Sequence, residues 1–414
     1  MVELDVNVKM WAWLTASTVN LVGTLSTAAA LPIVIYQATG NASAVSMLAV
    51  IEAVPYLVLG IGAGWMADRY NRQRLIIAGF TLSAMVSAVQ AVGLLSGVHL
   101  VLVYCCATIS AIVFTGTDAA EFGLLPQVIP EDRLPQAWGL STVLTNSCSV
   151  LVPAVAATTV ALLGATPILV LDSVSFLLAA VLISRLTLLP PGGSPESAAE
   201  NNNQDATGER GWRAGIVYIW SHSTLRPLVL SGLLNSAAFG AVTALLVVFA
   251  VDALGSPPAS TQTGVTFASV ALGGMLMGLA FDRIYSPQRI RLLTLIGTMG
   301  SAGSIALLIP STTVIYASVV LILYGACLSL TITSGIVFRQ SVAPECIRSR
   351  VMTVGRMIAW GGQPLGAAAA GIIATAWGIR SAYLLPTGLF VVAFMIASLI
   401  VRPSRTQLSV ACRG

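Results

Sequence analysis

The chain has 414 residues, of which 56% are hydrophobic and 9% are charged, and its formal net charge at pH 7 is +4. Soluble domains typically carry about 25% charged residues, so this composition excludes an ordinary soluble protein and indicates an integral membrane protein. The small positive charge is accounted for by arginines between apolar runs, so we expect no nucleic acid among the partners.

Apolar runs of about 20 residues, the length that crosses the hydrocarbon of a bilayer, recur along the whole chain. Backbone groups in lipid must be hydrogen bonded within their own segment, and the strands of a barrel would be shorter and alternating, so we expect helices. The predicted spans cover residues 11–36, 44–66, 75–96, 98–118, 137–163, 166–188, 226–251, 262–281, 290–309, 312–338, 351–377 and 379–401. The sequence therefore predicts an all-α membrane protein with twelve transmembrane helices.

A polar segment separates the predicted spans into two sets of six. We expect residues 1–189 to form one six-helix bundle and residues 226–414 a second, joined by a cytoplasmic linker at 190–225. The first part of the linker is rich in Pro, Gly, Ser and Asn, a composition typical of a flexible connection. Its second part mixes aromatic, basic and aliphatic residues from Trp212 to Arg226. Either a short amphipathic helix at the membrane interface or an early start of the seventh span explains that pattern.

Basic residues gather on one side of the predicted bilayer. With the N-terminus inside, Lys9 and nearly all arginines lie at or near the cytoplasmic face, and Arg380 alone lies outside. The reverse orientation would place almost every basic residue on the wrong side of the membrane. We therefore expect a multi-pass protein of the plasma membrane with both termini in the cytoplasm.

Two charged stretches with the same residue order recur in the two halves. The first, GWMADRYNRQRLI, begins at Gly64, and the second, GLAFDRIYSPQRIR, begins at Gly278. An interval of 214 positions relates Gly60, Gly64, Asp68 and Arg69 to Gly274, Gly278, Asp282 and Arg283. The same interval relates the Pro-Glu pair at 130 to the Pro-Glu pair at 344. One half is therefore a copy of the other, and we expect two pseudo-symmetric bundles with a substrate between them.

The first charged stretch resembles the loop motif between the second and third helices of the major facilitator superfamily. The matching residues are Gly64, Ala67, Asp68, Arg69 and Arg72, whereas Met66, Asn71 and Gln73 replace the usual Leu, Gly and Arg. We expect Asn71 to replace glycine because both residues enter left-handed backbone conformations more readily than others. The stretches LLPQVIPEDRLPQAWGL, LDSVSFLLAAVLISR and SVAPECIRSRVMTV resemble the branch of siderophore (enterobactin) and macrolide exporters. The resemblance covers nearly the whole chain and implies the two-bundle fold and alternating access.

The resemblance also implies a conformational latch on the cytoplasmic side. Its expected members are Gly60, Gly64, Asp68, Arg69, Arg72, Gly274, Gly278, Asp282 and Arg283. The glycines would let the second and eighth helices approach their neighbours closely. Asp68 would accept hydrogen bonds from free amides at the start of the eleventh helix when the cavity opens outward. For the arginines taken by themselves, the positive-inside rule is a sufficient explanation, whereas Asp68 and its counterpart Asp282 favour the latch.

Acidic residues inside a membrane are costly when isolated, so each of them needs a functional reason. Glu52 lies near the middle of the second span, and no basic residue of the first three spans can pair with it. It is our first choice for a proton-coupling residue, and a cationic substrate or a protonated carboxyl bonded to a neighbouring helix are the alternatives. Asp118 shares a helix face with Glu121 and could pair with Arg69 or Arg72, and ordinary charge at the membrane interface is the alternative. Asp172 ranks below Glu52, because it could cap or bridge helices instead.

Neutral polar residues at mid-depth are candidates for the lining of a substrate cavity. They are Asn20, Gln90, Asn146, Asn235 and Gln363. Uncharged amides among Met, Tyr and Phe residues suit an amphipathic substrate, although such amides also serve as hydrogen-bonded contacts between helices. The fifth span keeps Pro153 but lacks the glycines that exporters of the superfamily usually carry there. The eleventh span keeps Gly361, Gly362, Pro364, Gly366 and Gly371, so we hypothesise that flexibility has moved to the second half.

Together these patterns predict a proton-coupled exporter, an antiporter of a small amphipathic compound such as an antibiotic, a siderophore or another secondary metabolite. An importer, or a transporter-like membrane sensor without net flux, remains the alternative. No phosphate-binding glycine loop and no metal-ligand cluster occurs in the sequence, so we expect neither enzyme activity nor a cofactor or metal. The expected partners are the substrate, protons and the lipid bilayer, and we expect a monomer.

Overall fold

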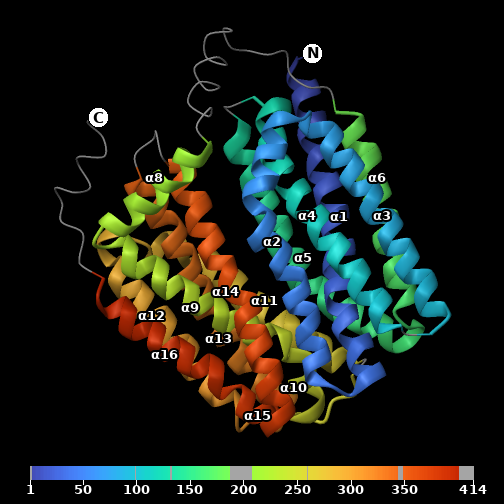
Figure 1. Ribbon diagram of the computed structural model, residues 1–414, viewed down its shortest axis with the longest axis vertical. Helices are drawn as coiled ribbons and strands as arrows, with labels where there is room; N and C mark the ends of the chain where they lie inside the picture. Colours follow the sequence, from blue (N-terminus) through green and yellow to red (C-terminus); the bar gives the residue numbers. More distant parts are fainter. Residues whose placement is uncertain are drawn as a thin grey trace.

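The computed structural model describes residues 2–97, 99–130, 133–186, 208–258, 260–343 and 348–400. Some side chains within these ranges lie outside the description, among them those of residues 60–65, 67, 68, 146, 282 and 356. In the described ranges the protein is almost entirely helical and contains no strand. Figure 1 shows two groups of long helices lying side by side.

The first group contains α1 (Val2–Thr39), α2 (Ala42–Arg69), α3 (Arg72–Leu95), α4 (Leu100–Val128), α5 (Leu134–Leu163) and α6 (Thr166–Ser184). The second contains α8 (Gly208–Ser221), α9 (Leu225–Ala244), α10 (Leu246–Asp252), α11 (Thr261–Ile284), the 3-10 helix η2 (Pro287–Arg289), α12 (Ile290–Leu308), α13 (Val314–Val342), α14 (Arg348–Trp377), α15 (Ile379–Ala382) and α16 (Leu384–Ser398). Within the described residues, nine helices are long and apolar enough to cross a membrane. The all-α membrane class is thus confirmed, and the count of twelve spans stays a prediction.

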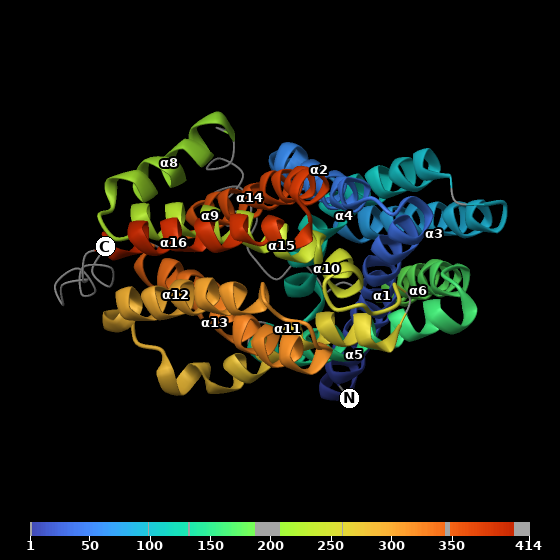
Figure 2. The same cartoon turned by 90° about the horizontal axis from the view of Figure 1, so that it is seen from below.

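The two groups repeat one packing arrangement. In the first bundle α1 packs on α5 and α6, α3 packs on α4 and α6, and α2 packs on α4. In the second bundle α9 packs on α14 and α16, α12 packs on α13 and α16, and α11 packs on α13. Each bound of α13 lies 214 residues after the corresponding bound of α4, and the same holds for α14 and α5. The pseudo-symmetry expected from the sequence repeat is therefore confirmed, and Figure 2 shows the paired bundles from below.

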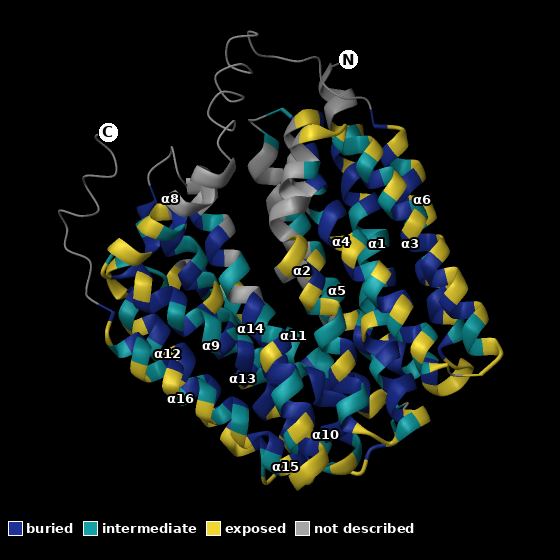
Figure 3. Ribbon diagram, viewed as in Figure 1, coloured by how far each residue is buried: buried dark blue, intermediate teal, exposed yellow. Residues whose placement is uncertain are grey.

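The outer faces of the bundles are apolar, as lipid requires. Along α6 the exposed large hydrophobic side chains are Val170, Leu171, Val174, Leu177, Leu178 and Val181. Figure 3 shows buried residues along the helix faces that point into each bundle and exposed residues along the outside. Hydrophobic side chains on both faces of a helix indicate a helix with protein on one side and hydrocarbon on the other.

Charge sorts the molecule into two ends. We call the end that holds α8, the α2–α3 turn and the start of α9 the basic end, and the opposite end, with α10 and α15, the far end (Figure 1). The basic residues of the basic end whose side chains the structure describes are Lys9, Arg69, Arg72, Arg74, Arg133, Arg185, Arg226, Arg283, Arg289, Arg291 and Arg339. Arg380 lies at the far end, where it donates hydrogen bonds to the carbonyl oxygens of Ile309 at 2.9 Å and Ser311 at 3.0 Å. This cation thus caps the end of α12, where carbonyls lack helix partners.

The α2–α3 turn corrects one prediction and explains a departure from the family motif. Asn71 has φ −62° and ψ 111°, so it is extended and not left-handed, and its side chain accepts a hydrogen bond from the Arg74 amide. It serves as the N-cap of α3, a position that favours asparagine. Gln73 donates from Nε2 to the carbonyl oxygens of Ile183 and Leu186, both at 2.8 Å. The glutamine that replaces the usual arginine therefore ties the turn to the end of α6.

α11 approaches α13 closely at a different glycine from the two that we expected. A Cβ at Gly273 would overlap the carbonyl oxygen of Ile322 and lie 2.8 Å from the Ala326 amide nitrogen. A Cβ at Gly274 would make ordinary contacts at 3.8 and 3.9 Å, and one at Gly278 would meet nothing within 4 Å. The expectation that Gly274 and Gly278 bring this helix against its neighbour is wrong for this conformation, because Gly273 occupies the contact.

The second part of the linker forms a helix of its own. α8 ends at Ser221, and α9 starts only at Leu225, after a break in which the Nδ1 atom of His222 accepts from the Thr224 and Leu225 amides at 3.2 and 3.4 Å. α8 packs on α14 and α9, and the Tyr218 hydroxyl donates to the Val342 carbonyl oxygen at 2.9 Å. The sequence left open either a separate helix or an early start of the seventh span, and the structure shows the separate helix. Its position at a membrane surface stays a prediction.

We predict that Gly273→Ala destabilises the protein while Gly278→Ala does not. The new methyl group at 273 would enter the backbone of α13, and such overpacking costs about 1–3 kcal/mol. The same group at 278 faces open space. Apparent melting temperatures in detergent, measured by fluorescence-detected size exclusion after heating, compare the two variants. Equal melting temperatures would show that the α11–α13 contact is looser than described.

We predict a pH dependence of stability at the break between α8 and α9. Burial disfavours the charged imidazole and lowers the pKa of His222. A lowered folded-state pKa gives a stabilisation that is fully present above the unfolded pKa of about 6.5 and is lost as pH falls below it. His222→Asn keeps a capping oxygen that does not titrate, so its melting temperature should fall less between pH 7.5 and pH 5.5 than that of the wild type. His99→Asn, at the exposed start of α4, is the control and should follow the wild type.

Candidate functional site at the interface between the bundles

Two helix crossings join the bundles near the far end. α2 of the first bundle packs along α14 of the second, and α5 of the first bundle packs along α11 of the second (Figure 2). Each crossing therefore pairs one helix from each bundle. A Cβ at Gly371 would lie 2.5 Å from the Ser46 Cβ, and a Cβ at Gly264 would lie 2.6 Å from the Ala154 Cα. At both crossings a glycine therefore lets the opposite bundle approach the backbone directly.

Hydrogen bonds cross between the bundles at the same end. The Ser43 hydroxyl donates to the Gly371 carbonyl oxygen at 3.1 Å and lies 2.5 Å from the Thr375 hydroxyl. The hydroxyls of Thr158 and Thr261 lie 2.9 Å apart. A further bond runs from the Tyr36 hydroxyl, at the end of α1, to a carboxylate oxygen of Asp252, at the end of α10. These contacts seal the far end with small polar groups.

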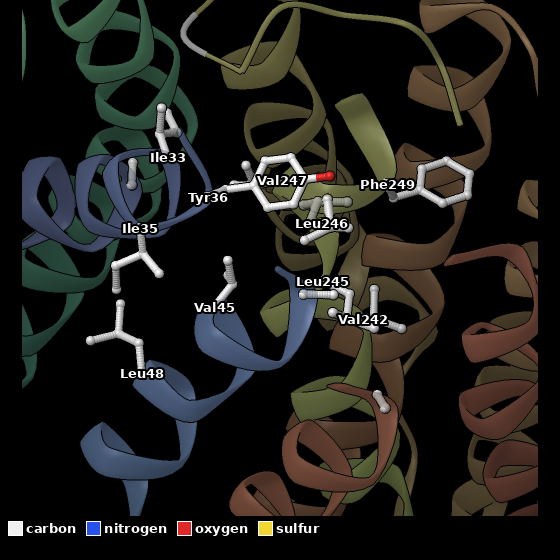
Figure 4. Close-up of a cluster of buried hydrophobic side chains, with 14 of the residues drawn as sticks. Ile33, Ile35, Tyr36, Val45, Leu48, Val242, Leu245, Leu246, Val247 and Phe249 are labelled. Atoms are coloured by element: carbon white, nitrogen blue, oxygen red, sulfur yellow. The ribbon is translucent and has the colours of Figure 1, made fainter. Parts of the chain in front are cut away.

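The hydrophobic core follows the same division. One cluster contains residues of both bundles at the far end, and Figure 4 shows Tyr36 and Val45 of the first bundle on the side of Leu246 and Val247 of the second. Toward the basic end the core separates into a cluster with Leu14 and Leu125 in the first bundle and a cluster with Leu228 and Phe338 in the second. Among the side chains that the structure describes, the bundles share one core at the far end and have separate cores at the basic end.

Glu52 lies just inside the sealed end. It stands six residues after Ser46 on α2, which places it about 9 Å from the Gly371 contact toward the basic end. Glu52 is exposed. Glu52 therefore faces accessible space beside the α2–α14 crossing and not the packed core of a bundle.

Asp172 occupies a different environment. It is 3% exposed, and its Oδ2 atom accepts a hydrogen bond from the Ser87 hydroxyl at 2.9 Å. A Cβ at Gly23 on α1 would lie 2.6 Å from Oδ1 of this carboxyl. Asp172 thus bridges α6 to α3 and abuts α1 within the first bundle. This placement fits the bridging role better than a role in proton coupling.

The cavity candidates are dispersed. Gln90 is buried on α3, which packs on α4 and α6, so it lies inside the first bundle and not between the bundles. Asn235 is buried on α9, and neither atom of its amide has a hydrogen-bond partner among the described residues. The Oδ1 atom of Asn20 also has none there. Gln363 lies on α14, where a Cβ at Gly240 would be 2.7 Å from its Cα. Asn146 lies outside the described side chains.

The latch candidates are only partly described. The side chains of Asp68 and Asp282, and the surroundings of Gly60 and Gly64, lie outside the described residues. α2 and α11, which carry these residues, both end at the basic end, as the repeat predicts. Arg69, Arg72 and Asp118 each take part in interactions with neighbouring residues. The latch and the pairing of Asp118 with an arginine stay predictions.

Sequence reasoning missed the contacts that close the far end. Ser43 and Thr375, or Tyr36 and Asp252, are separated by hundreds of residues and have no distinctive spacing. Gly371 was singled out as a source of flexibility, whereas the structure shows it as a contact with the other bundle. The positive-inside rule predicts the side of the membrane on which Arg339 lies but not that this arginine is buried.

Two pseudo-symmetric membrane bundles, whose described cores are shared at one end and separate at the other, define the class of carriers built from repeated halves. Residues 13–362 match the Major Facilitator Superfamily. The match covers most of the chain, which therefore belongs to this superfamily.

Among curated proteins, the chain is 24% identical over 368 residues to macrolide efflux protein A of Streptococcus pyogenes, covering 87% of this chain and 88% of that protein. It is 25% identical over 388 residues to the multidrug efflux pump Tap of Mycolicibacterium fortuitum, covering 91% and 90%. These relatives confirm the similarity to macrolide exporters that the loop stretches indicated.

Solved transporter structures share the fold. A bacterial homologue of the human lysosomal transporter Spinster, in an inward-facing and occupied conformation, has a TM-score of 0.75 at 12% identity and covers 96% of this chain and 97% of that one. A bacterial homologue of the iron transporter ferroportin, in an inward-facing state, has a TM-score of 0.72 at 13% identity, with coverage of 94% and 97%. At these identities the likeness shows the fold alone.

We predict that Gly371→Leu and Gly264→Leu open the far end. Each side chain would enter the backbone of the opposite bundle, so the bundles could not close there. Spin labels at Ala38 and Ala376, exposed at the far end, should report longer distances by pulsed electron resonance. Gly303→Leu is the control, because a Cβ at Gly303 meets nothing within 4 Å. Unchanged distances in both variants would contradict the proposed seal.

Proposed function

We propose that the protein is a proton-coupled exporter of a small amphipathic compound and works by alternating access. The observation that carries this proposal is the one-ended join between two pseudo-symmetric bundles, closed by glycine contacts and hydroxyl hydrogen bonds. Such contacts are weak enough to be exchanged for equivalent contacts at the other end. The names of the relatives, a macrolide efflux protein and a multidrug efflux pump, support export and a cargo such as an antibiotic or another secondary metabolite.

Orientation follows from charge. Of the basic residues whose side chains the structure describes, eleven lie at the basic end and one lies at the far end. The positive-inside rule then supports a cytoplasmic basic end with both termini inside. In that orientation the bundles are joined on the outer side and separate on the cytoplasmic side. An exporter takes up its cargo in such a state.

Glu52 is the residue we assign to proton coupling. It is an acid in the second span, exposed beside the α2–α14 crossing, and α14 must move relative to α2 when the far end opens. A carboxyl whose surroundings change between the two states can bind a proton in one and release it in the other. Asp172 and Asp118 remain weaker candidates, the first because it is bonded within one bundle.

An importer is the second candidate, and one observation favours it. The fifth span lacks the glycines usual in exporters, and α5 keeps only Pro153 inside the helix. A membrane sensor would bind cargo without moving it. Proteoliposomes loaded with cargo distinguish these readings, since an exporter, an importer and a sensor differ in the direction or absence of flux.

We predict that Glu52→Gln abolishes proton-dependent efflux. The test measures accumulation of fluorescent macrolides and other amphipathic drugs in cells, with and without a proton uncoupler. The uncoupler should raise drug accumulation with the wild type, whereas Glu52→Gln should show high accumulation in either condition. Asp172→Asn, which keeps a hydrogen-bonding side chain inside the first bundle, should retain at least part of the uncoupler-sensitive efflux. Normal efflux by Glu52→Gln would remove this residue from coupling.

A further inference from the structure

The helix α8 is a part of the second bundle that the proposed function does not use. Its inner face covers the ends of the spans at the basic end, since Ile219 is 0% exposed and belongs to the same core cluster as Leu225 of α9 and Ala397 of α16. The Tyr218 hydroxyl ties it to Val342, the last residue of α13. α8 therefore lies at the level where the spans end, which in a bilayer is the headgroup region.

The sequence repeat does not require this helix. The break between α8 and α9 covers residues 222–224, and the residues 214 positions earlier, 8–10, lie inside the unbroken helix α1. In the second bundle His222 caps the start of α9 instead, so that the chain turns there. Figure 2 shows α8 at the rim of this bundle, outside α9, α14 and α16. The first bundle has no equivalent of this arrangement among its described residues.

The outer face of α8 is apolar. Val217 is 64% exposed and Trp220 is 47% exposed, and because they stand three residues apart they share one face of the helix. A helix that borders water on its outer side normally carries polar side chains there. Amphipathic helices with Trp and aliphatic residues on one face lie in the interface of a bilayer, where Trp is enriched.

Two observations identify lipid as the occupant of this face. On the neighbouring α16, Val392, Met395 and Leu399 are exposed along one face, so the lipid-facing surface of the second bundle continues to the level of α8. Arg226, in the first turn of α9, is exposed just beyond the end of α8. The cytoplasmic leaflet carries anionic headgroups, which attract basic side chains close to its surface.

We propose that α8 and the first turn of α9 form a binding site for an anionic phospholipid of the cytoplasmic leaflet. Val217 and Trp220 contact the upper part of its acyl chains, and the Arg226 guanidinium pairs with its phosphate. Because Ile219 and Tyr218 join α8 to the ends of the spans, a lipid bound here holds the basic end of the second bundle together. The inference uses the cytoplasmic orientation of the basic end and goes beyond the proposed transport activity.

Spin labels measure the depth of α8 in lipid nanodiscs. In the full chain without native cysteines, Val217→Cys carries the label, Met395→Cys is the reference for lipid, and Ser341→Cys, exposed at the basic end, is the reference for water. The label at 217 should be reached by oxygen and shielded from a water-soluble nickel chelate, as at 395. A label at 217 that the chelate reaches as well as at 341 would overturn the proposal.

Native mass spectrometry of the full chain measures binding as phosphatidylglycerol is titrated. One cation near an anionic surface changes affinity about fivefold, so Arg226→Gln should weaken binding by about that factor, and Trp220→Ala should also weaken it. Two variants are matched controls and should bind as the wild type does. Arg289→Gln removes an exposed charge of the basic end on η2, and Trp377→Ala removes an exposed Trp at the far end of α14.

Three outcomes of this titration would contradict the site. Equal losses in Arg226→Gln and Arg289→Gln would show a general attraction of the basic end. Equal binding of phosphatidylcholine and phosphatidylglycerol would remove the role of the charge. Saturable binding of glycerol 3-phosphate, with displacement of the lipid, would show a site for a free anion that needs no bilayer.

Melting temperatures test the stabilising effect. Phosphatidylglycerol in the nanodiscs should raise the melting temperature of the wild type and of Arg289→Gln, and raise that of Arg226→Gln less. The variants should melt alike in phosphatidylcholine, because each replaces an exposed side chain. None of these measurements depends on transport, so a failure of efflux would leave the lipid site standing. Normal efflux without any lipid effect would remove the site and leave the proposed function.

Discussion

The crossings of α2 over α14 and of α5 over α11 are the contacts on which the arrangement of the two bundles depends. Lipid supplies no hydrophobic drive between helices, so their association rests on close packing and a few hydrogen bonds. Gly371 and Gly264 permit the packing, and hydroxyls such as those of Ser43 and Thr158 supply bonds with a net value of only about 1 kcal/mol each. A seal made of such terms holds the bundles without locking them, which a two-state carrier requires.

The acids of the chain show how environment assigns roles to one chemical group. Asp172 is enclosed within one bundle and bonded to Ser87, so its contacts need not change when the bundles move. Glu52 is exposed beside the α2–α14 crossing. In the proposed exporter the surroundings of Glu52 would change with that crossing, whereas those of Asp172 would not.

Departures from the family motif acquire a physical explanation in the structure. Asn71 replaces the glycine of the family motif without a left-handed backbone conformation. Its backbone is extended, and its side chain caps α3. Gln73 replaces a charge with an amide that satisfies two carbonyl groups at the end of α6. Local sequence reasoning could not find either contact, since one depends on a backbone angle and the other on a helix more than 100 residues away.

The sequence by itself determined the helices, their division into repeated halves, the sorting of charge to one end and the family. These properties follow from the composition of short segments, from residue period and from a fixed interval, all of which are local or can be counted along the chain. The tertiary structure decided which glycine meets which backbone: Gly273 and not Gly278 within the second bundle, and Gly371 between the bundles. The tertiary structure also decided that the Tyr36 hydroxyl donates a hydrogen bond to Asp252. It decided as well that Arg339 is buried, although its counterpart in the sequence repeat, Leu125, is apolar. Such facts depend on the angle and register at which distant helices cross, and no pattern along a single helix encodes either quantity.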